Sequence, residues 1–189
     1  IMDTDGDPID SVVGFSHQTA GAEMAEALVG AGRTRFGYIG CNLESDIRAN
    51  KRKQGFADAL SRHNIAITAT LSCAGLSSVG AGRRLTQELL TQSPDLDCIY
   101  YSNDDVAFGG LCYCLEAGVD VPTRVALAGF NGLSLLQGFP GLIATSTTQR
   151  RDIGRASAEI ILESLRNPER AKGRQLIMQP AVELGALQK

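Results

Sequence analysis

Acidic residues near the start of the sequence are spaced as they are in some calcium-binding loops. Asp3, Asp5 and Asp7 alternate with other residues, as the first ligands of an EF-hand loop do. That loop also needs glycine at its sixth position and glutamate at its twelfth, where this sequence has Pro8 and Gly14. The pattern therefore predicts a turn, and we expect no metal site here.

Other reactive side chains lack the partners that catalysis or cofactor binding would need. A serine nucleophile needs a histidine base, and the sequence offers only His17 and His63 and no Gly-x-Ser-x-Gly turn. Cys112 and Cys114 lie two residues apart in an expected helix, so they point to different faces and do not suit a metal clip. The glycines at 80 and 82 are not followed by the third glycine of a dinucleotide-binding loop. We therefore predict no enzyme, no catalytic residues, no metal and no cofactor.

A basic run at residues 48–53 opens an expected helix. It holds Arg48, Lys51, Arg52 and Lys53. From the residues alone, a solvated charged face is the favoured interpretation for Arg48, Lys51 and Lys53. Binding of an anionic ligand stays open as the alternative.

Composition narrows the class of protein. The 189 residues are 43% hydrophobic and 21% charged, which suits a folded chain rather than a disordered one. The net charge of −3 argues against this segment wrapping nucleic acid by itself. No apolar run reaches the ~18 residues of a membrane span, and the sequence opens without a signal-peptide pattern. Five cysteines without framework spacing favour reduced thiols, so we expect a cytoplasmic location.

Short apolar runs alternate with helical stretches along the whole sequence. Helices are predicted from Ser16, the candidate N-cap, to Gly30 or Gly32, and over residues 49–62, 79–90, 104–117 and 150–165. The last of them has a stripe of apolar residues along one side. Strands are predicted over residues 12–15, 36–40, 65–67, 98–101, 125–130 and 143–145, with late strands at 176–178 and 182–184. This alternation is typical of an α/β fold, with doubly wound parallel sheets covered by helices on both faces. Ligands of such sheets lie at the carboxyl ends of the strands.

Four segments, in order and in register, resemble the effector-binding core of the LacI-type transcriptional regulators. They are RTRFGYIG at 33–40, RKQGFADAL at 52–60, NDDVAFG at 103–109 and VPTRVALAGFN at 121–131. The segments PIDSVVGFS at 8–16 and GFNG at 129–132 are most similar to gluconate-responsive repressors of that family.

The resemblance implies a periplasmic-binding-protein-like fold of two subdomains around a ligand cleft. Residues 1–40 and 147–178 would form a partial N-terminal subdomain, truncated at its start. Residues 41–145 would form the C-terminal subdomain, to which residues 179–189 return. Family members also carry an N-terminal helix-turn-helix and act as homodimers, so the abrupt start at Ile1 resembles the interior of a longer sequence.

Positions that match the family's ligand contacts form the expected effector site. Arg52 matches an arginine that hydrogen-bonds ligand oxygens, and Asn103 matches a side-chain amide contact. Asn131 stands where many members have an aspartate, and this departure favours an anionic ligand because it removes a negative charge. Arg48 is a further candidate contact, and Asp3 could reach the cleft from the other subdomain.

The leading hypothesis is therefore the effector-binding part of a LacI-type repressor. It would sense a small sugar or sugar acid, with gluconate the leading candidate, and would bind DNA only through the absent helix-turn-helix domain. The alternative is a periplasmic-type solute-binding protein for a sugar. An enzyme on a flavodoxin-like sheet is a third class, for which the sequence offers no site.

Overall fold

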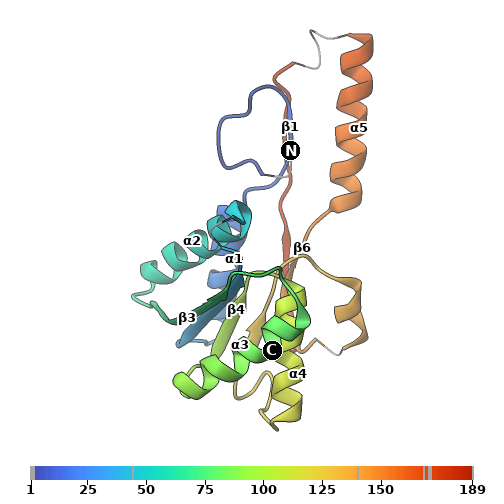
Figure 1. Ribbon diagram of the computed structural model, residues 1–189. Helices are drawn as coiled ribbons and strands as arrows, with labels where there is room; N and C mark the ends of the chain where they lie inside the picture. The colour runs from blue at the N-terminus through green and yellow to red at the C-terminus, as the bar shows by residue number, and fades with distance from the viewer. Residues whose placement is uncertain (1–2, 44, 140, 168, 170–171, 189) are drawn as a thin grey trace.

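The larger part of the molecule is built on a six-stranded sheet. The computed structural model describes residues 3–43, 45–139, 141–167, 169 and 172–188. The strands of this sheet are β2 (Phe36–Cys41), β3 (Ile67–Cys73), β4 (Cys98–Tyr101), β5 (Ala126–Ala128), β6 (Ile143–Thr147) and β8 (Ala181–Glu183). They lie in the order β3-β2-β4-β5-β6-β8, and Figure 1 labels β3, β4 and β6. All neighbours pair in parallel except β8, which is antiparallel to β6. The predicted α/β class with parallel sheets is confirmed.

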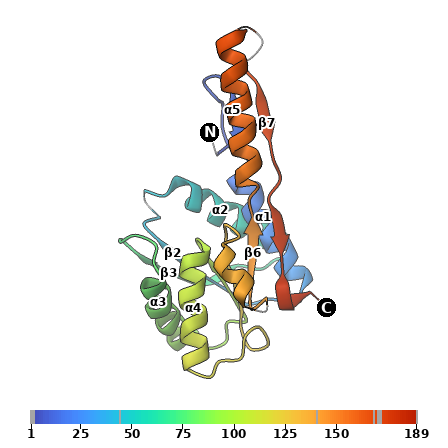
Figure 2. The same ribbon diagram turned by 90° about the vertical axis from the view of Figure 1, so that its right-hand side faces the viewer.

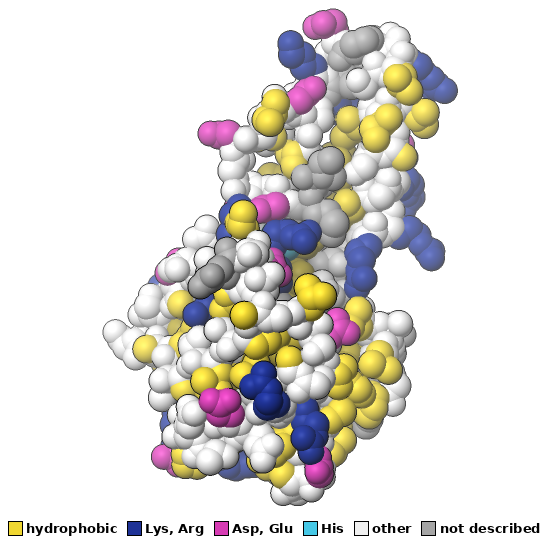
Figure 3. Space-filling view, viewed as in Figure 1, with side chains coloured by type: hydrophobic (Ala, Val, Ile, Leu, Met, Phe, Trp, Pro, Cys, Tyr) yellow, Lys and Arg dark blue, Asp and Glu magenta, His cyan; other side chains and the backbone are white. Residues whose placement is uncertain are grey.

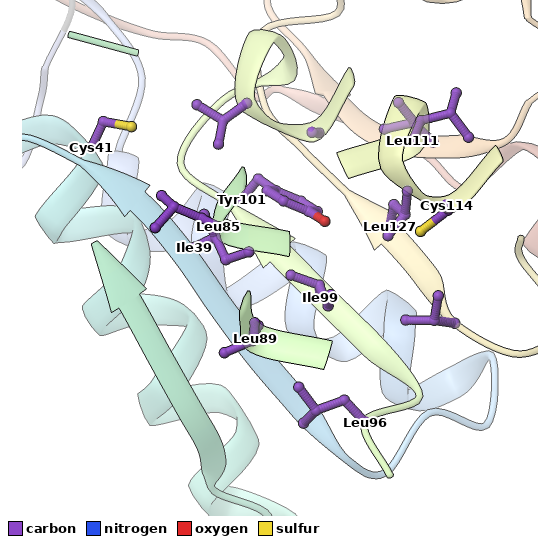
Figure 4. Packing of buried hydrophobic residues seen from close by; sticks show 14 residues of the cluster. Ile39, Cys41, Leu85, Leu89, Leu96, Ile99, Tyr101, Leu111, Cys114 and Leu127 are labelled. Carbon is purple, nitrogen blue, oxygen red and sulfur yellow. The ribbon is translucent and has the colours of Figure 1, made fainter. Parts of the chain in front are cut away.

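Helices cover both faces of this sheet. On one face, α1 (His17–Gly30) and α2 (Ile47–Arg62) bury Met24, Leu28, Phe56 and Leu60 against side chains of β2 and β4. On the other face, α3 (Val79–Gln92) and α4 (Asp104–Glu116) bury a second apolar cluster. Figure 4 shows that cluster, in which Ile39 and Ile99 of the sheet meet Leu85 and Leu89 of α3. Because successive side chains of a strand point to opposite faces, a central strand such as β4 contributes to both cores and is buried throughout.

Polar side chains cap the N-termini of the helices α1, α2 and α4, each of which follows a strand. Ser16 Oγ accepts a hydrogen bond from the backbone N–H of Thr19 at 2.9 Å, so it caps α1 as predicted. Asp46 and Asn103 cap α2 and α4 in the same way. These caps hold three helix N-termini at one edge of the sheet, where the carboxyl ends of the strands lie.

A narrower arm projects from this body. In Figures 1 and 2, α5 (Arg150–Arg166) runs away from the six-stranded sheet beside β1 (Val12–Gly14) and β7 (Gln175–Ile177). Strands β1 and β7 pair in parallel. Part of the arm's apolar surface is exposed, and on α5 and β7 it comprises Ile161, Leu162, Leu165, Leu176 and Ile177.

The pairing of the strands differs from the predicted division of the chain at residues 40 and 41. Strand β2 lies between β3 and β4 in the larger sheet, and α1 packs against α2. Residues 17–41 therefore lie with the larger body, whereas the resemblance predicts residues 1–40 in the partial N-terminal subdomain. We propose that the subdomain boundary falls near Ser16, with the later crossings after β6 and before β8.

Strand β3 also differs from its prediction. We expected a strand at residues 65–67, whereas β3 runs over Ile67–Cys73 with side chains that alternate between half-buried and exposed. An edge strand of this kind needs few large apolar residues. The sequence of β3, ITATLSC, has only Ile67 and Leu71, so the prediction covers only its start. No helix in the described part of the chain has the length and apolar character to span a membrane.

Candidate effector-binding site

A cavity lies where the carboxyl ends of five strands converge. It has a volume of about 250 Å³ and is lined by Phe15, His17, Asp46, Arg48, Arg52, Asn103, Phe130, Asn131, Thr148 and Arg150. These residues follow β1, β2, β4, β5 and β6, so distant parts of the sequence meet here because the strands are parallel. Figure 3 shows basic side chains gathered at the junction between the body and the arm.

Arg52 is held rigidly in the wall of the cavity. Its side chain is buried, and its Nη2 donates a hydrogen bond to the carbonyl oxygen of Ser102 at 2.8 Å. Its Nη1 lies 2.8 Å from Nδ1 of His17, and its guanidinium stacks 4.1 Å from the ring centre of Phe130. Within the described part of the chain, Nε of Arg52 has no hydrogen-bond partner.

His17 is neutral in this arrangement. Arginine can only donate, so Nδ1 of His17 must accept from Arg52 and the proton of the ring must lie on Nε2. Burial, and then the positive charge of Arg52, lower the pKa of His17 from 6.5 to about 4. Among the described residues Nε2 has no partner either, so the cavity wall contains two buried donors without an acceptor.

Asn131 presents a free amide. Its backbone has a φ of 124°, an unusual conformation that asparagine tolerates better than most residues. The loop that carries it is clasped by buried Asp104, whose backbone N–H donates to the carbonyl of Phe130 at 3.0 Å and whose Oδ2 accepts from the N–H of Leu133 at 2.9 Å. No hydrogen bond of the Asn131 side chain is found within the described part of the molecule. Its amide can therefore donate to and accept from a ligand.

Asn103 lies at the rim with its amide already engaged. Its Oδ1 accepts from the N–H of Val106 at 3.1 Å, and its Nδ2 donates to Oγ of Ser77 at 2.7 Å. One N–H of the amide is left for a ligand, so a contact with Asn103 would be a secondary one.

The two remaining predicted site residues, Arg48 and Asp3, differ in whether they line the cavity. Arg48 is exposed and lines the cavity. Asp3 is not in the cavity lining, and its Oδ2 instead pairs with Nζ of Lys51 at 2.7 Å. Burial by itself would raise the pKa of Asp3. The hydrogen bonds from Lys51 and from the backbone N–H of Asp5, together with the positive charge of Lys51, outweigh burial, so the pKa lies below its usual value.

Sequence reasoning missed three charged or polar groups of the lining. His17 is considered above only as a possible catalytic base, and Asp46 and Arg150 are not among the predicted site residues. All three follow directly on strand ends, a signal that could have found them. With three guanidinium groups, one carboxylate and a neutral imidazole, the lining carries a surplus of positive charge that suits a small anionic ligand.

The fold and this cavity define a binding domain of periplasmic-binding-protein type. Residues 25–186 match the family described as "Periplasmic binding protein-like domain", and the chain belongs to that family.

Similar proteins narrow the class to LacI-type regulators. The chain is 32% identical over 167 residues to the HTH-type transcriptional regulator IdnR of Escherichia coli, covering 88% of this chain and 50% of that protein. It is 36% identical over 176 residues to the HTH-type transcriptional regulator GntR of Pseudomonas aeruginosa, covering 89% and 49%. A LacI family transcriptional regulator from Silicibacter pomeroyi has a crystal structure that matches with a TM-score of 0.93 and 44% identity, over 100% of this chain and 57% of that one. The chain is thus a LacI-type effector-binding domain, and it spans about half the length of the curated relatives it matches.

Proposed function

We propose that this chain is the effector-sensing part of a transcriptional repressor that responds to a sugar acid, with gluconate the leading candidate. The observation that carries the proposal is the cationic cavity at the strand ends, with the free amide of Asn131 in its wall. Guanidinium groups bind carboxylates through charge-assisted hydrogen bonds, and the amide and the unpartnered donors suit hydroxyl groups. Nothing in this role requires catalysis, so we propose a sensor rather than an enzyme.

The effector would act on DNA binding through the relative position of the two subdomains. The cavity is lined both by the body, through Arg52 and Asn131, and by residues at the base of the arm, through Phe15 and Arg150. A ligand that contacts both parts stabilises one arrangement of them, and this is how it would control a helix-turn-helix domain of a cytoplasmic homodimer. Because the relatives named above are transcriptional regulators, they favour this role over a periplasmic solute-binding protein.

The variant Asn131→Asp tests whether the ligand is a sugar acid, because it adds a negative charge at position 131. In the full-length protein, Asn131→Asp places an acceptor-only anion beside the ligand, so gluconate affinity should fall about 5- to 150-fold, or ~1–3 kcal/mol. Glucose should lose little affinity or gain some, because a carboxylate accepts hydroxyl hydrogen bonds well. Calorimetric titration with both ligands measures the difference.

A matched control separates this effect from backbone strain. Asn64 also has a positive φ, of 57°, and it lies in an exposed turn after α2. Asn64→Asp should leave both affinities unchanged. Equal losses for gluconate and glucose in Asn131→Asp, or no loss for either, would contradict a sugar-acid effector.

A further inference from the structure

Two further arginines line the cavity, Arg48 and Arg150, and their surroundings differ from those of Arg52. Arg52 is buried and already donates two hydrogen bonds, to His17 and Ser102, so the protein itself fixes its orientation. Arg48 and Arg150 line the same cavity with exposed side chains. Arg48 makes no ion pair within the described part of the structure, so its charge is available to a ligand.

Arg150 stands at an electrostatically unfavourable place. It is the first residue of α5, where the unpaired N–H groups of the helix give a partial positive charge, and cations are normally favoured at the opposite end. The residue before it, Gln149, provides no side-chain cap. This guanidinium lies near the charges of Arg48 and Arg52. Asp46 in the lining and Asp152 in the first turn of α5 offset only part of this positive charge, so a bound anion would be favoured here.

Two buried donors in the wall also favour a ligand that carries acceptor oxygens. Nε2 of His17 and Nε of Arg52 belong to side chains at least nine-tenths buried and have no partner among the described residues. Both are donors, so both need an acceptor such as a hydroxyl or carboxylate oxygen.

Resting on the sugar-acid function proposed above, we propose that Arg150, together with Arg48, binds the carboxylate of the effector. Arg52 then shapes the wall and holds hydroxyl groups with His17 and Asn131. Arg150 also ties two parts of the molecule together, because its Nη2 donates to the carbonyl oxygen of Asn131 at 2.5 Å. Binding of the carboxylate by Arg150 therefore links ligand charge to the position at which α5 leaves the body.

Calorimetric titration of the full-length protein with gluconate and with glucitol tests this assignment. The two ligands differ only at one end, where gluconate has a carboxylate and glucitol has a CH₂OH group. Arg150→Gln should weaken gluconate about 10- to 100-fold and change glucitol less than ~3-fold. Arg150→Lys keeps the charge but loses the planar fork, so its loss for gluconate should be intermediate. The matched control is Arg151→Gln, one residue further along α5 and outside the cavity lining, which should change neither affinity.

The outcomes separate this inference from the proposed function. If the unaltered protein prefers gluconate to glucitol but Arg150→Gln behaves like Arg151→Gln, the role of Arg150 is overturned and the sugar-acid function stands. If the unaltered protein binds neither gluconate nor other six-carbon aldonates, both are overturned. Thermal unfolding midpoints of the Arg150 variants within ~2 °C of that of the unaltered protein would show that a loss of affinity is not a loss of folding. A larger drop in the midpoint of Arg150→Gln, with gluconate affinity unchanged in Arg150→Lys, would show that the residue is structural and would overturn the inference.

Discussion

Arg52 Nη1 lies 2.8 Å from Nδ1 of His17, so a buried cation and a buried imidazole share a hydrogen bond in the wall of the cavity. The imidazole must stay neutral to accept this bond. Burial of the ring, and then the positive charge of Arg52, disfavour its protonation, which is why the pKa of His17 is lowered to about 4.

Stability should therefore depend on pH through His17. In the unfolded chain this histidine titrates near 6.5, whereas in the fold it stays neutral to about pH 4. The contribution of neutral His17 to the free energy of unfolding is fully present above pH 6.5 and is lost as the pH falls from 6.5 to about 4. The loss amounts to at most roughly 3 kcal/mol. Urea unfolding at pH 7, 6, 5 and 4.5 measures this loss. His17→Gln should lack that part of the pH dependence, and parallel curves for the two proteins would contradict it.

Arg52 and Arg48 should differ in their effect on stability although both line the cavity. Arg52→Met leaves the carbonyl of Ser102 and Nδ1 of His17 buried without a donor, at a cost of about 2–4 kcal/mol. Arg48→Met, one turn earlier on the same helix and exposed, should change the free energy of unfolding by less than ~0.5 kcal/mol. Denaturant unfolding of both variants tests the contrast, and similar costs would show that Arg52 is not the structural member of the pair.

The approach of α1 and α2 depends on glycine. A Cβ on Gly55 would lie 1.9 Å from the carbonyl oxygen of Gln18, and one on Gly21 would lie 2.0 Å from that of Arg52. Gly55→Ala should force the helices apart, cost about 2–4 kcal/mol and displace Arg52. Gly154→Ala is the control, because its Cβ would meet no atom within 4 Å, and alanine in this helix should add ~0.5–1 kcal/mol. A loss of stability in Gly154→Ala, or none in Gly55→Ala, would contradict this account of the packing.

Local patterns in the sequence were sufficient for most of the elements. Ser16 caps α1 as predicted, and α5 follows its apolar stripe within a residue of the expected end. These features depend on neighbours three or four residues away, so a single sequence contains them. The edge strand β3 and the sheet membership of β2 depend on partners far along the chain, and their predictions were incomplete or wrong.

The candidate site also combines residues that the sequence indicated with contacts that only the fold brings about. A resemblance to a family pointed to Arg52, Asn103 and Asn131, which line the cavity. Asp3 was a candidate from its place in the sequence, and it pairs with Lys51 outside the lining. The contact between His17 and Arg52 joins residues 35 positions apart, and Arg150 reaches the site only because β6 ends beside β5. The position of His17 and Arg150 after predicted strands indicates that they lie at the strand ends, but only the topology shows which side chains they meet there.

The most direct test of the sugar-acid assignment is the ratio of two dissociation constants in the unaltered full-length protein, for gluconate and for glucitol. The two ligands have the same carbon skeleton and differ in the carboxylate alone. A lining with three guanidinium groups and one carboxylate predicts that gluconate binds about 10- to 100-fold more tightly at low ionic strength, and that the ratio shrinks as salt is added. Equal affinities, or tighter binding of glucitol, would contradict a cavity built for a sugar acid.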